Sequence, residues 1–208
     1  MLGLGVKLAR PRTWAFIILA YSIGWSLTGS PFSLQYAVGL IIYILLVANV
    51  NIINAYTDID EDRINLPQRV KMVEQIGYKR LPYIVAAISA VCLALSFTMN
   101  WVFSVILIIA LLNGLFYSLR PLRFKTHPVL SLFSFSGAVV FPLIGAWVIA
   151  KNIIDIPLLI IFLGFSFLVW NYKESSRLLW RQSCWIKDHS DYFQNQKASY
   201  SCSNISLT

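Results

Sequence analysis

The sequence has little charge, few acidic residues and few cysteines. Only 12% of its 208 residues are charged, and 9 Asp and Glu stand against 17 Lys and Arg, which gives a net charge of +8. Soluble domains carry about 25% charged residues, so the low content argues against an ordinary soluble fold. The three cysteines, Cys92, Cys184 and Cys202, are odd in number and lack metal-ligand spacing. They therefore give no indication of a disulfide framework.

Long apolar runs take the place of the missing charge. Hydrophobic residues make up 58% of the chain, and the mean hydropathy is +0.68. This content excludes disorder. A membrane-spanning helix needs about 20 mostly apolar residues, and we predict an all-α, polytopic transmembrane helical bundle with six spans. The predicted spans are Thr13–Gly29, Tyr36–Thr57, Pro82–Met99, Trp101–Leu119, Val129–Ala150 and Ile156–Asn171.

The basic residues predict how the spans are oriented. Segments 7–12, 63–80 and 120–125 carry eleven Lys and Arg that fall on one side of the predicted spans, whereas Lys151 is the only basic residue on the other. The positive-inside rule therefore places the N-terminus and both basic loops in the cytoplasm. We expect an integral, multi-pass protein of the cell membrane. Binding of nucleic acid is disfavoured, because the basic residues are divided among short loops.

The composition changes abruptly after Asn171. Residues 172–208 contain eight serines, eight charged residues and no glycine. We therefore expect a transmembrane region over residues 1–171 and a polar tail over residues 172–208.

Acidic residues gather where the second predicted span meets water. Asn54, Asp58 and Asp62 recur every four residues, so on one continuous helix they share a face. Oxygen ligands on one face suit Mg²⁺, which keeps waters and bridges to substrate phosphates. Asp60 and Glu61 are expected to point elsewhere and to be solvated. The motif predicts a magnesium site.

Two other interpretations of this acidic stretch are possible. The first is a plain interfacial acidic loop that balances Arg63 and Arg69, and the sequence leaves it open. The second is an EF-hand, which fails because Arg63 replaces the glycine and Arg69 replaces the final glutamate. Pro67 ends the helix nearby. Arg69 is then free to reach anionic oxygens, which a guanidinium binds as a fork.

A second polar stretch follows the fourth predicted span and reads YSLRPLRFKTHP. Its cations Arg120, Arg123 and Lys125 would be explained by the positive-inside rule alone. They nevertheless fall on the same predicted side as the acidic motif. Metal ligands opposite a cationic loop are what a diphosphate group requires. Tyr117 lies at the predicted membrane boundary. It is explained equally well as an ordinary interfacial aromatic residue and as part of this site.

These residues resemble a known pattern. The Asn54, Asp58 and Asp62 spacing resembles the first aspartate-rich motif, NxxxDxxxD, of the UbiA superfamily of intramembrane prenyltransferases. The match extends over roughly residues 8–171. It also includes segments similar to the family's N-x-P-x-R, Y-S-x-x-P-L-R-L-K and N-terminal motifs, which here are Asn65–Arg69, Tyr117–Lys125, Arg10-Pro11 and Trp14.

The resemblance implies a function. Members of this family transfer a prenyl group from an isoprenyl diphosphate to an aromatic or lipid acceptor within the membrane, with Mg²⁺ as cofactor. Tyr117 would be catalytic, because its ring would face the reacting allylic carbon and stabilise developing positive charge. The family's other roles would fall to Asn54, Asp58 and Asp62 as Mg²⁺ ligands, and to Arg69, Arg123 and Lys125 as ligands of the diphosphate.

Part of the family pattern is missing from the chain. The family has about nine spans and a second aspartate motif after the sixth, whereas Asp188 and Asp191 lack its surroundings. Codons chosen for residues 170–193 can, when read one nucleotide later, encode a DYSGD stretch that resembles this second motif. We therefore expect a frameshifted or truncated member, with natural divergence as the alternative, and little or no prenyl transfer. A membrane transporter and a non-catalytic membrane scaffold remain alternative functions.

Overall fold

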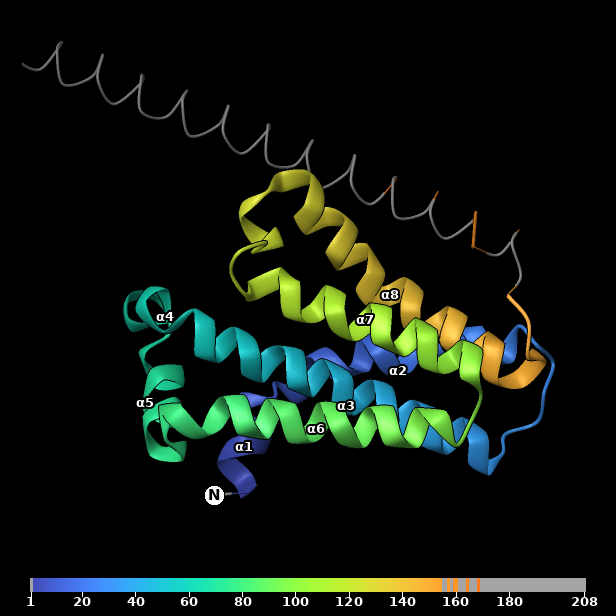
Figure 1. Cartoon of the computed structure of the whole chain (residues 1–208), viewed down its shortest axis with the longest axis horizontal. Coiled ribbons are helices and arrows are strands. Elements are labelled where there is room, and N and C mark those ends of the chain that lie inside the picture. Colours follow the sequence, from blue (N-terminus) through green and yellow to red (C-terminus); the bar gives the residue numbers. More distant parts are fainter. Residues whose placement is uncertain (1, 155–156, 158, 161–163, 165–167, 169–208) are drawn as a thin grey trace, which may run out of the picture. The chain divides into compact units, whose positions relative to one another are not determined.

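The computed structural model describes residues 2–154, 157, 159–160, 164 and 168. Within these residues the chain forms α-helices and short 3-10 turns and no strand, which confirms the all-α class (Figure 1). The helices described here all belong to one compact unit, which ends at Leu163. The predicted sixth span, Ile156–Asn171, lies outside the described residues except for five positions. The 172–208 tail lies outside them altogether.

Among the described residues, four helices are long and apolar enough to cross a membrane, and they correspond to the second to fifth predicted spans. Asn100 lies in the short link between the second and third of them. Its side chain accepts a hydrogen bond from the N–H of Val102 at 2.7 Å and so caps the start of the next helix. The tight hairpin predicted there is confirmed. The four helices are α3 (Leu34–Thr57), α6 (Leu81–Phe97), α7 (Trp101–Ser118) and α8 (Pro128–Lys151).

The first predicted span is shorter than expected. Helix α2 is Trp14–Ser26, and its 13 residues reach only about 20 Å at 1.5 Å per residue. Thr28 closes it with a hydroxyl hydrogen bond to the carbonyl of Trp25 at 2.6 Å. Although α2 is short, it packs closely against α8. A Cβ atom at Gly24 would overlap the backbone of Leu143 in α8. The two helices therefore touch backbone to backbone.

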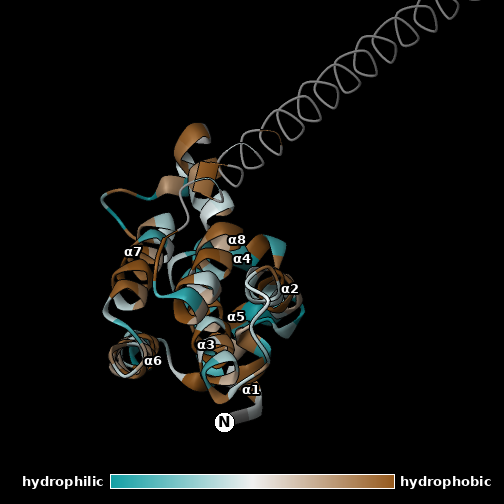
Figure 2. Ribbon diagram, turned by 90° about the vertical axis from the view of Figure 1, so that its right-hand side faces the viewer, coloured by the Kyte–Doolittle hydropathy of each residue, from teal (hydrophilic) through white to brown (hydrophobic). Residues whose placement is uncertain are grey.

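The core of the bundle is aromatic and aliphatic. Tyr21, Tyr43 and Phe103 are completely buried, from α2, α3 and α7. The hydroxyl of Tyr43 donates to the carbonyl of Phe141 in α8 at 2.7 Å. Apolar side chains such as Phe16 and Tyr83 are more than 70% exposed on the outside, and Figure 2 shows apolar residues on all the long helices. Such a surface suits lipid rather than water, in agreement with an integral, multi-pass membrane protein.

A smaller cluster holds the N-terminal segment to one end of the bundle. Leu8, the last residue of α1 (Leu2–Leu8), packs with residues of α3 and α6 and with Val73 of α5 (Pro67–Ile76). The side-chain amide of Asn51 donates to the carbonyl of Ala9 at 2.9 Å and to the hydroxyl of Thr13 at 3.0 Å. These bonds fix the chain where it enters the bundle.

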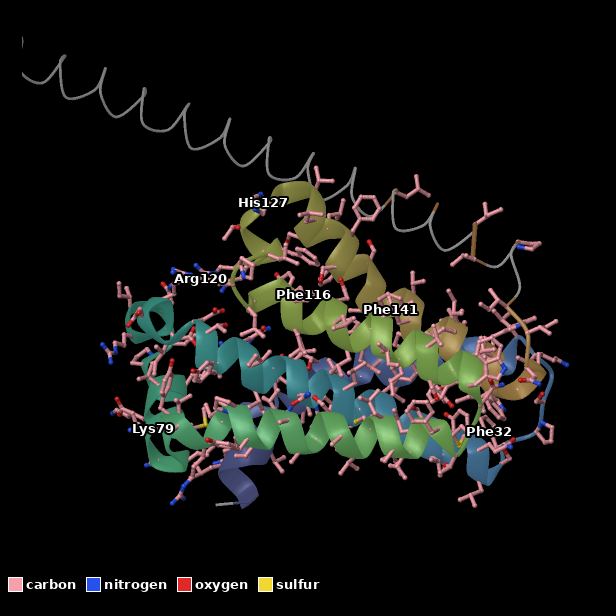
Figure 3. All side chains as sticks on the ribbon, in the orientation of Figure 1. Phe32, Lys79, Phe116, Arg120, His127 and Phe141 are labelled. Atoms are coloured by element: carbon pink, nitrogen blue, oxygen red, sulfur yellow. The ribbon has the colours of Figure 1, made fainter. Side chains whose placement is uncertain are left out.

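The basic segments lie at one end of the bundle, as the sequence predicts. Helices α1, α4 (Ile59–Asn65) and α5 gather there (Figure 1). Lys79 and Arg120 lie at this end, whereas Phe32 lies at the other (Figure 3). The acidic motif and the basic loop after α7 therefore come within reach of one another.

Candidate active site

The acidic motif is not carried by one continuous helix. Helix α3 ends at Thr57, and α4 begins at Ile59. Asp58 forms the junction with φ −104° and ψ 16°, and its carboxylate accepts from the Thr57 hydroxyl at 2.9 Å. The i to i+4 backbone bonds of Asp58 and Asp62 persist at 3.0 and 2.7 Å. The i to i+4 spacing thus survives, but the expectation of one continuous helix was wrong, and the two carboxylates have different neighbours.

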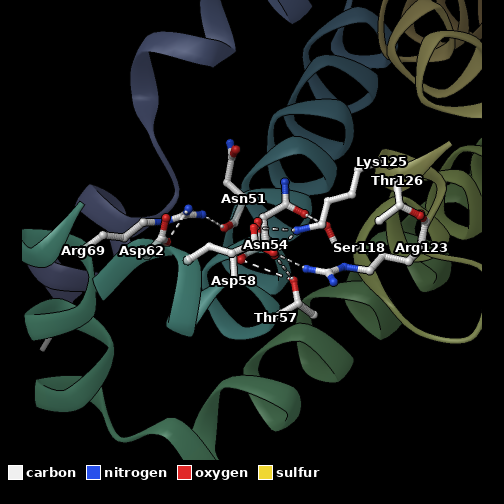
Figure 4. A network of polar contacts seen from close by, with 11 residues as sticks. Asn51, Asn54, Thr57, Asp58, Asp62, Arg69, Ser118, Arg123, Lys125 and Thr126 are labelled. Carbon is white, nitrogen blue, oxygen red and sulfur yellow. Dashed lines mark hydrogen bonds and ion pairs between the residues drawn. The ribbon is translucent and has the colours of Figure 1, made fainter. Parts of the chain in front are cut away.

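Asp58 faces the basic loop that follows α7. Its Oδ1 accepts a hydrogen bond from Nζ of Lys125, in an ion pair whose side chains are 18% and 14% exposed. Figure 4 shows Lys125 and Arg123 reaching toward Asp58 from one direction, while Asp62 and Arg69 lie on the other side. The predicted meeting of the acidic motif with the cationic loop is therefore present in the structure.

Asp62 is paired in the interior. Arg69 Nη1 donates to its Oδ2 at 2.8 Å, and both side chains are only 9% exposed. Arg69 Nη2 donates to the carbonyl of Asn51 at 3.1 Å. Burial lowers the pKa of Arg69, repulsion from Arg10 lowers it further, and Asp62 counteracts both. This pair matches the simpler interpretation, in which the acidic loop balances its own arginines.

Glu61 is a site residue that sequence reasoning placed elsewhere. It was expected to be solvated, and its side chain is indeed 58% exposed. It nevertheless accepts a hydrogen bond from Arg123 Nη2 at 2.6 Å and lies 3.7 Å from Nζ of Lys125. Asp60, by contrast, is 89% exposed, and its ion pair with the exposed Arg63 is a long one of 3.8 Å. Glu61 therefore holds the two cations of the basic loop beside Asp58.

Ser118 is a second residue that the sequence did not single out. It is buried at the end of α7, and its hydroxyl donates to Oδ1 of Asn54. Tyr117 precedes it on the last turn of α7 and is half-buried. The contact attaches the end of α7 to the acidic motif, and so brings Tyr117 to the end of the bundle that holds Asp58. The only signal in the sequence was the Tyr-Ser pair itself.

The donor atoms of the motif suit a hard cation. Asn54, Asp58 and Asp62 offer only oxygen, as Mg²⁺ prefers. They supply two carboxylates and one amide, and among the described residues no three His, Cys, Asp or Glu side chains are grouped for a metal. Lys125 places its positive charge against Asp58. The residues fit Mg²⁺ as a partial ligand set, which waters and substrate oxygens would complete.

Comparison with known families agrees with this geometry. Residues 13–175 match the UbiA prenyltransferase family. The chain belongs to that family. A comparison with curated proteins finds no significant match.

Solved UbiA structures resemble this UbiA-family chain. A UbiA homolog from Archaeoglobus fulgidus bound to GPP and Mg²⁺ is 27% identical, with a TM-score of 0.71 over 82% of this chain and 61% of its own. A UbiA homolog from Archaeoglobus fulgidus bound to DMAPP and Mg²⁺ is 26% identical, with a TM-score of 0.70 over 81% of this chain and 60% of its own. A digeranylgeranylglyceryl phosphate synthase structure, 22% identical with a TM-score of 0.72 over 81% and 60%, shares the fold. The chain thus spans about 60% of the length of these relatives.

Proposed function

We propose that the chain carries out, or forms the diphosphate-binding part of, Mg²⁺-dependent transfer of a prenyl group within the membrane. The donor would be an isoprenyl diphosphate, and the acceptor an aromatic or lipid molecule. One observation carries the proposal: Asp58 and Lys125, 67 residues apart, form an ion pair at one end of an apolar bundle. The N-terminus and this end would face the cytoplasm, in the cell membrane.

Carboxylates and cations would divide the binding of the diphosphate. Asn54, Asp58 and Asp62 would hold Mg²⁺, which neutralises the charge that develops on the leaving diphosphate. Lys125 and Arg123 would bind diphosphate oxygens. Both cations now neutralise carboxylates, so an entering diphosphate with its metal would exchange one set of ion pairs for another. The cations are therefore already positioned before the substrate arrives.

Arg69 has a different place in the proposal from the one its sequence position suggested. Two of its nitrogens are bound to Asp62 and to the carbonyl of Asn51. We infer that it acts on the diphosphate through Asp62, whose carboxylate it holds in one orientation. Such a residue positions a ligand rather than contacting the substrate.

Tyr117 and the apolar helices would protect the reacting carbon. An aromatic face stabilises a developing allylic cation, and Tyr117 is held at the site end by the neighbouring Ser118–Asn54 contact. Apolar walls exclude the water that would capture that cation. Phe103 and Leu107 of α7 are completely buried in the apolar core on the same helix.

The distribution of charge disfavours a transporter. A transport path would place ionisable residues in mid-span, whereas Asp58, Glu61 and Asp62 lie where α3 ends. In the middle of α3 the buried Asn49 donates to the hydroxyl of Ser89, which is a neutral contact. A non-catalytic scaffold would keep the fold without binding substrate, and the following experiment separates it from the enzyme.

Binding of GPP to the chain in lipid nanodiscs, followed by calorimetry with and without Mg²⁺, tests the proposal. We expect saturable binding that needs Mg²⁺ and is abolished by EDTA. Absence of binding under both conditions would contradict the proposal and favour a scaffold. Mass spectrometry of added aromatic and lipid acceptors reads out transfer in the same samples. Prenylated product would contradict the sequence-based expectation of little or no transfer.

A further inference from the structure

A basic cavity lies apart from the Asp58–Lys125 pair. It has a volume of about 620 Å³ and lies between the N-terminal segment and the junction of α4 with α5. None of its lining residues is acidic. Its four basic lining residues come from two segments that are far apart in the sequence, and they are Lys7, Arg10, Arg12 and Arg69.

The N-terminus of α5 opens onto this cavity. Leu66 occupies the N-cap position and provides no side-chain cap, and the first turn contains no acidic residue. Pro67 has no N–H and the N–H of Arg69 bonds the carbonyl of Leu66 at 2.8 Å, so the positive end of the helix dipole is what remains without a compensating charge in this turn. Pro67 and Gln68 of this turn line the cavity. An anion is the usual complement of such a helix end.

Arg69 supplies a second, independent indication of an anion. Its side chain is more than nine-tenths buried and lines the cavity. Nη1 and Nη2 bind Asp62 and a backbone carbonyl, but Nε is buried without a hydrogen-bond partner. Buried donors of charged groups are normally satisfied.

The opposite wall is held in shape by the bundle. Asn51 bonds the carbonyl of Ala9 and the hydroxyl of Thr13 and so fixes the turn between them. Arg10 at that turn has φ 52°, a left-handed conformation that is unusual for a residue with a side chain. Strain of this kind persists where the surrounding structure enforces it, and it concentrates at ligand sites.

We propose that this cavity binds a phosphate group, at a site separate from the one that holds the prenyl diphosphate. The group would be the headgroup phosphate of an anionic phospholipid or a free phosphate. The exposed Lys7, Arg10 and Arg12 line the cavity, and the helices beside it, α1 and α5, gather at one end of the bundle (Figure 1). A phosphate with several charge-assisted hydrogen bonds would satisfy these cations together with the α5 N-terminus.

Paired variants of equal charge test the site in the full chain. Lys7→Gln with Arg12→Gln removes two exposed cavity cations, whereas Lys71→Gln with Lys79→Gln removes two exposed cations from outside the cavity in the same region of the chain. Native mass spectrometry of protein from nanodiscs that mix phosphatidylcholine with phosphatidylglycerol measures retained anionic lipid. Inorganic phosphate, added to phosphatidylcholine nanodiscs, tests the free anion through the midpoint of thermal unfolding. EDTA is present throughout, which keeps the test independent of the Mg²⁺ site.

We expect the cavity variant to retain at least about tenfold less phosphatidylglycerol than the control variant, since one lost hydrogen bond to a charged group already weakens binding by about tenfold or more. Protection by inorganic phosphate alone, again lost only in the cavity variant, would assign the site to a free phosphate. Equal losses in the two variants would show general surface attraction and overturn the proposal. So would the absence of both lipid retention and protection by phosphate.

Discussion

The two carboxylates of the acidic motif, Asp58 and Asp62, lie four residues apart but have different surroundings. Asp62 is buried against Arg69, which is anchored in turn to the backbone of α3. Asp58 stands at the junction of α3 and α4, opposite a lysine from a distant loop. A single sequence motif therefore contains one residue that builds the site and one that can exchange its partner for a ligand.

Burial explains why these residues differ in their energetics. Removing one partner of a buried ion pair leaves a charge without compensation and destabilises by about 3–5 kcal/mol. Exposed pairs contribute about 0–1 kcal/mol, because water screens them. The comparison thus predicts that substitutions have effects of decreasing size. Asp62 should affect stability most, Lys125 should affect ligand binding, and the exposed Glu61 should have a small effect on both.

The largest effect is expected on stability at Asp62. Asp62→Asn leaves the buried Arg69 without its carboxylate, so we expect the free energy of unfolding to fall by about 3–5 kcal/mol. Titration with a denaturing detergent, followed by circular dichroism, measures it. Asp60→Asn is the control because Asp60 is 89% exposed. Similar losses in the two variants would remove the distinction between the buried and the exchangeable carboxylate.

A smaller effect is expected on ligand binding at Lys125. Lys125→Gln removes a charge-assisted contact to the diphosphate, and such contacts are worth about 1.5–3 kcal/mol, or roughly ten- to a hundredfold in affinity. Calorimetry with GPP and Mg²⁺ measures the change. Lys151→Gln, at the far end of α8, removes the same charge and should leave the affinity unchanged. Weakening by both variants alike would point to overall charge instead of the site.

The smallest effect is expected at Glu61. Glu61→Gln frees Arg123 and Lys125 from an exposed partner, so stability should change by about 1 kcal/mol or less. The affinity for GPP should stay within a few-fold of the original or rise slightly. A large loss of affinity in this variant would mean that Glu61 itself binds the metal or holds the loop in place.

Local patterns in the sequence predicted most of the long helices. The spans that became α3, α6, α7 and α8, and the hairpin at Asn100, follow from apolar runs and a capping residue. Helix α2 ends at Ser26, where the hydroxyl of Thr28 bonds the carbonyl of Trp25, and its close contact with α8 at Gly24 is a tertiary property. An apolar window does not contain that information.

The site was less accessible from sequence. The motif identified Asn54, Asp58 and Asp62, but not the break at Asp58 that separates their neighbours. The contacts of Glu61 with Arg123 and of Ser118 with Asn54 join residues more than sixty positions apart. Such contacts depend on how α7 packs beside α3, so spacing along the chain could not reveal them.

One measurement tests the central claim most directly: the affinity of the chain for GPP with and without Mg²⁺, compared between the original sequence and Asp58→Asn. In Asp58→Asn the Nζ of Lys125 keeps Glu61 as a partner at 3.7 Å, so we expect a smaller loss of stability than in Asp62→Asn. We predict that the original chain binds GPP only with Mg²⁺ and that Asp58→Asn loses this dependence together with most of its affinity. Mg²⁺-dependent binding that is unchanged in a folded Asp58→Asn variant would contradict the assignment of Asp58 to the diphosphate site.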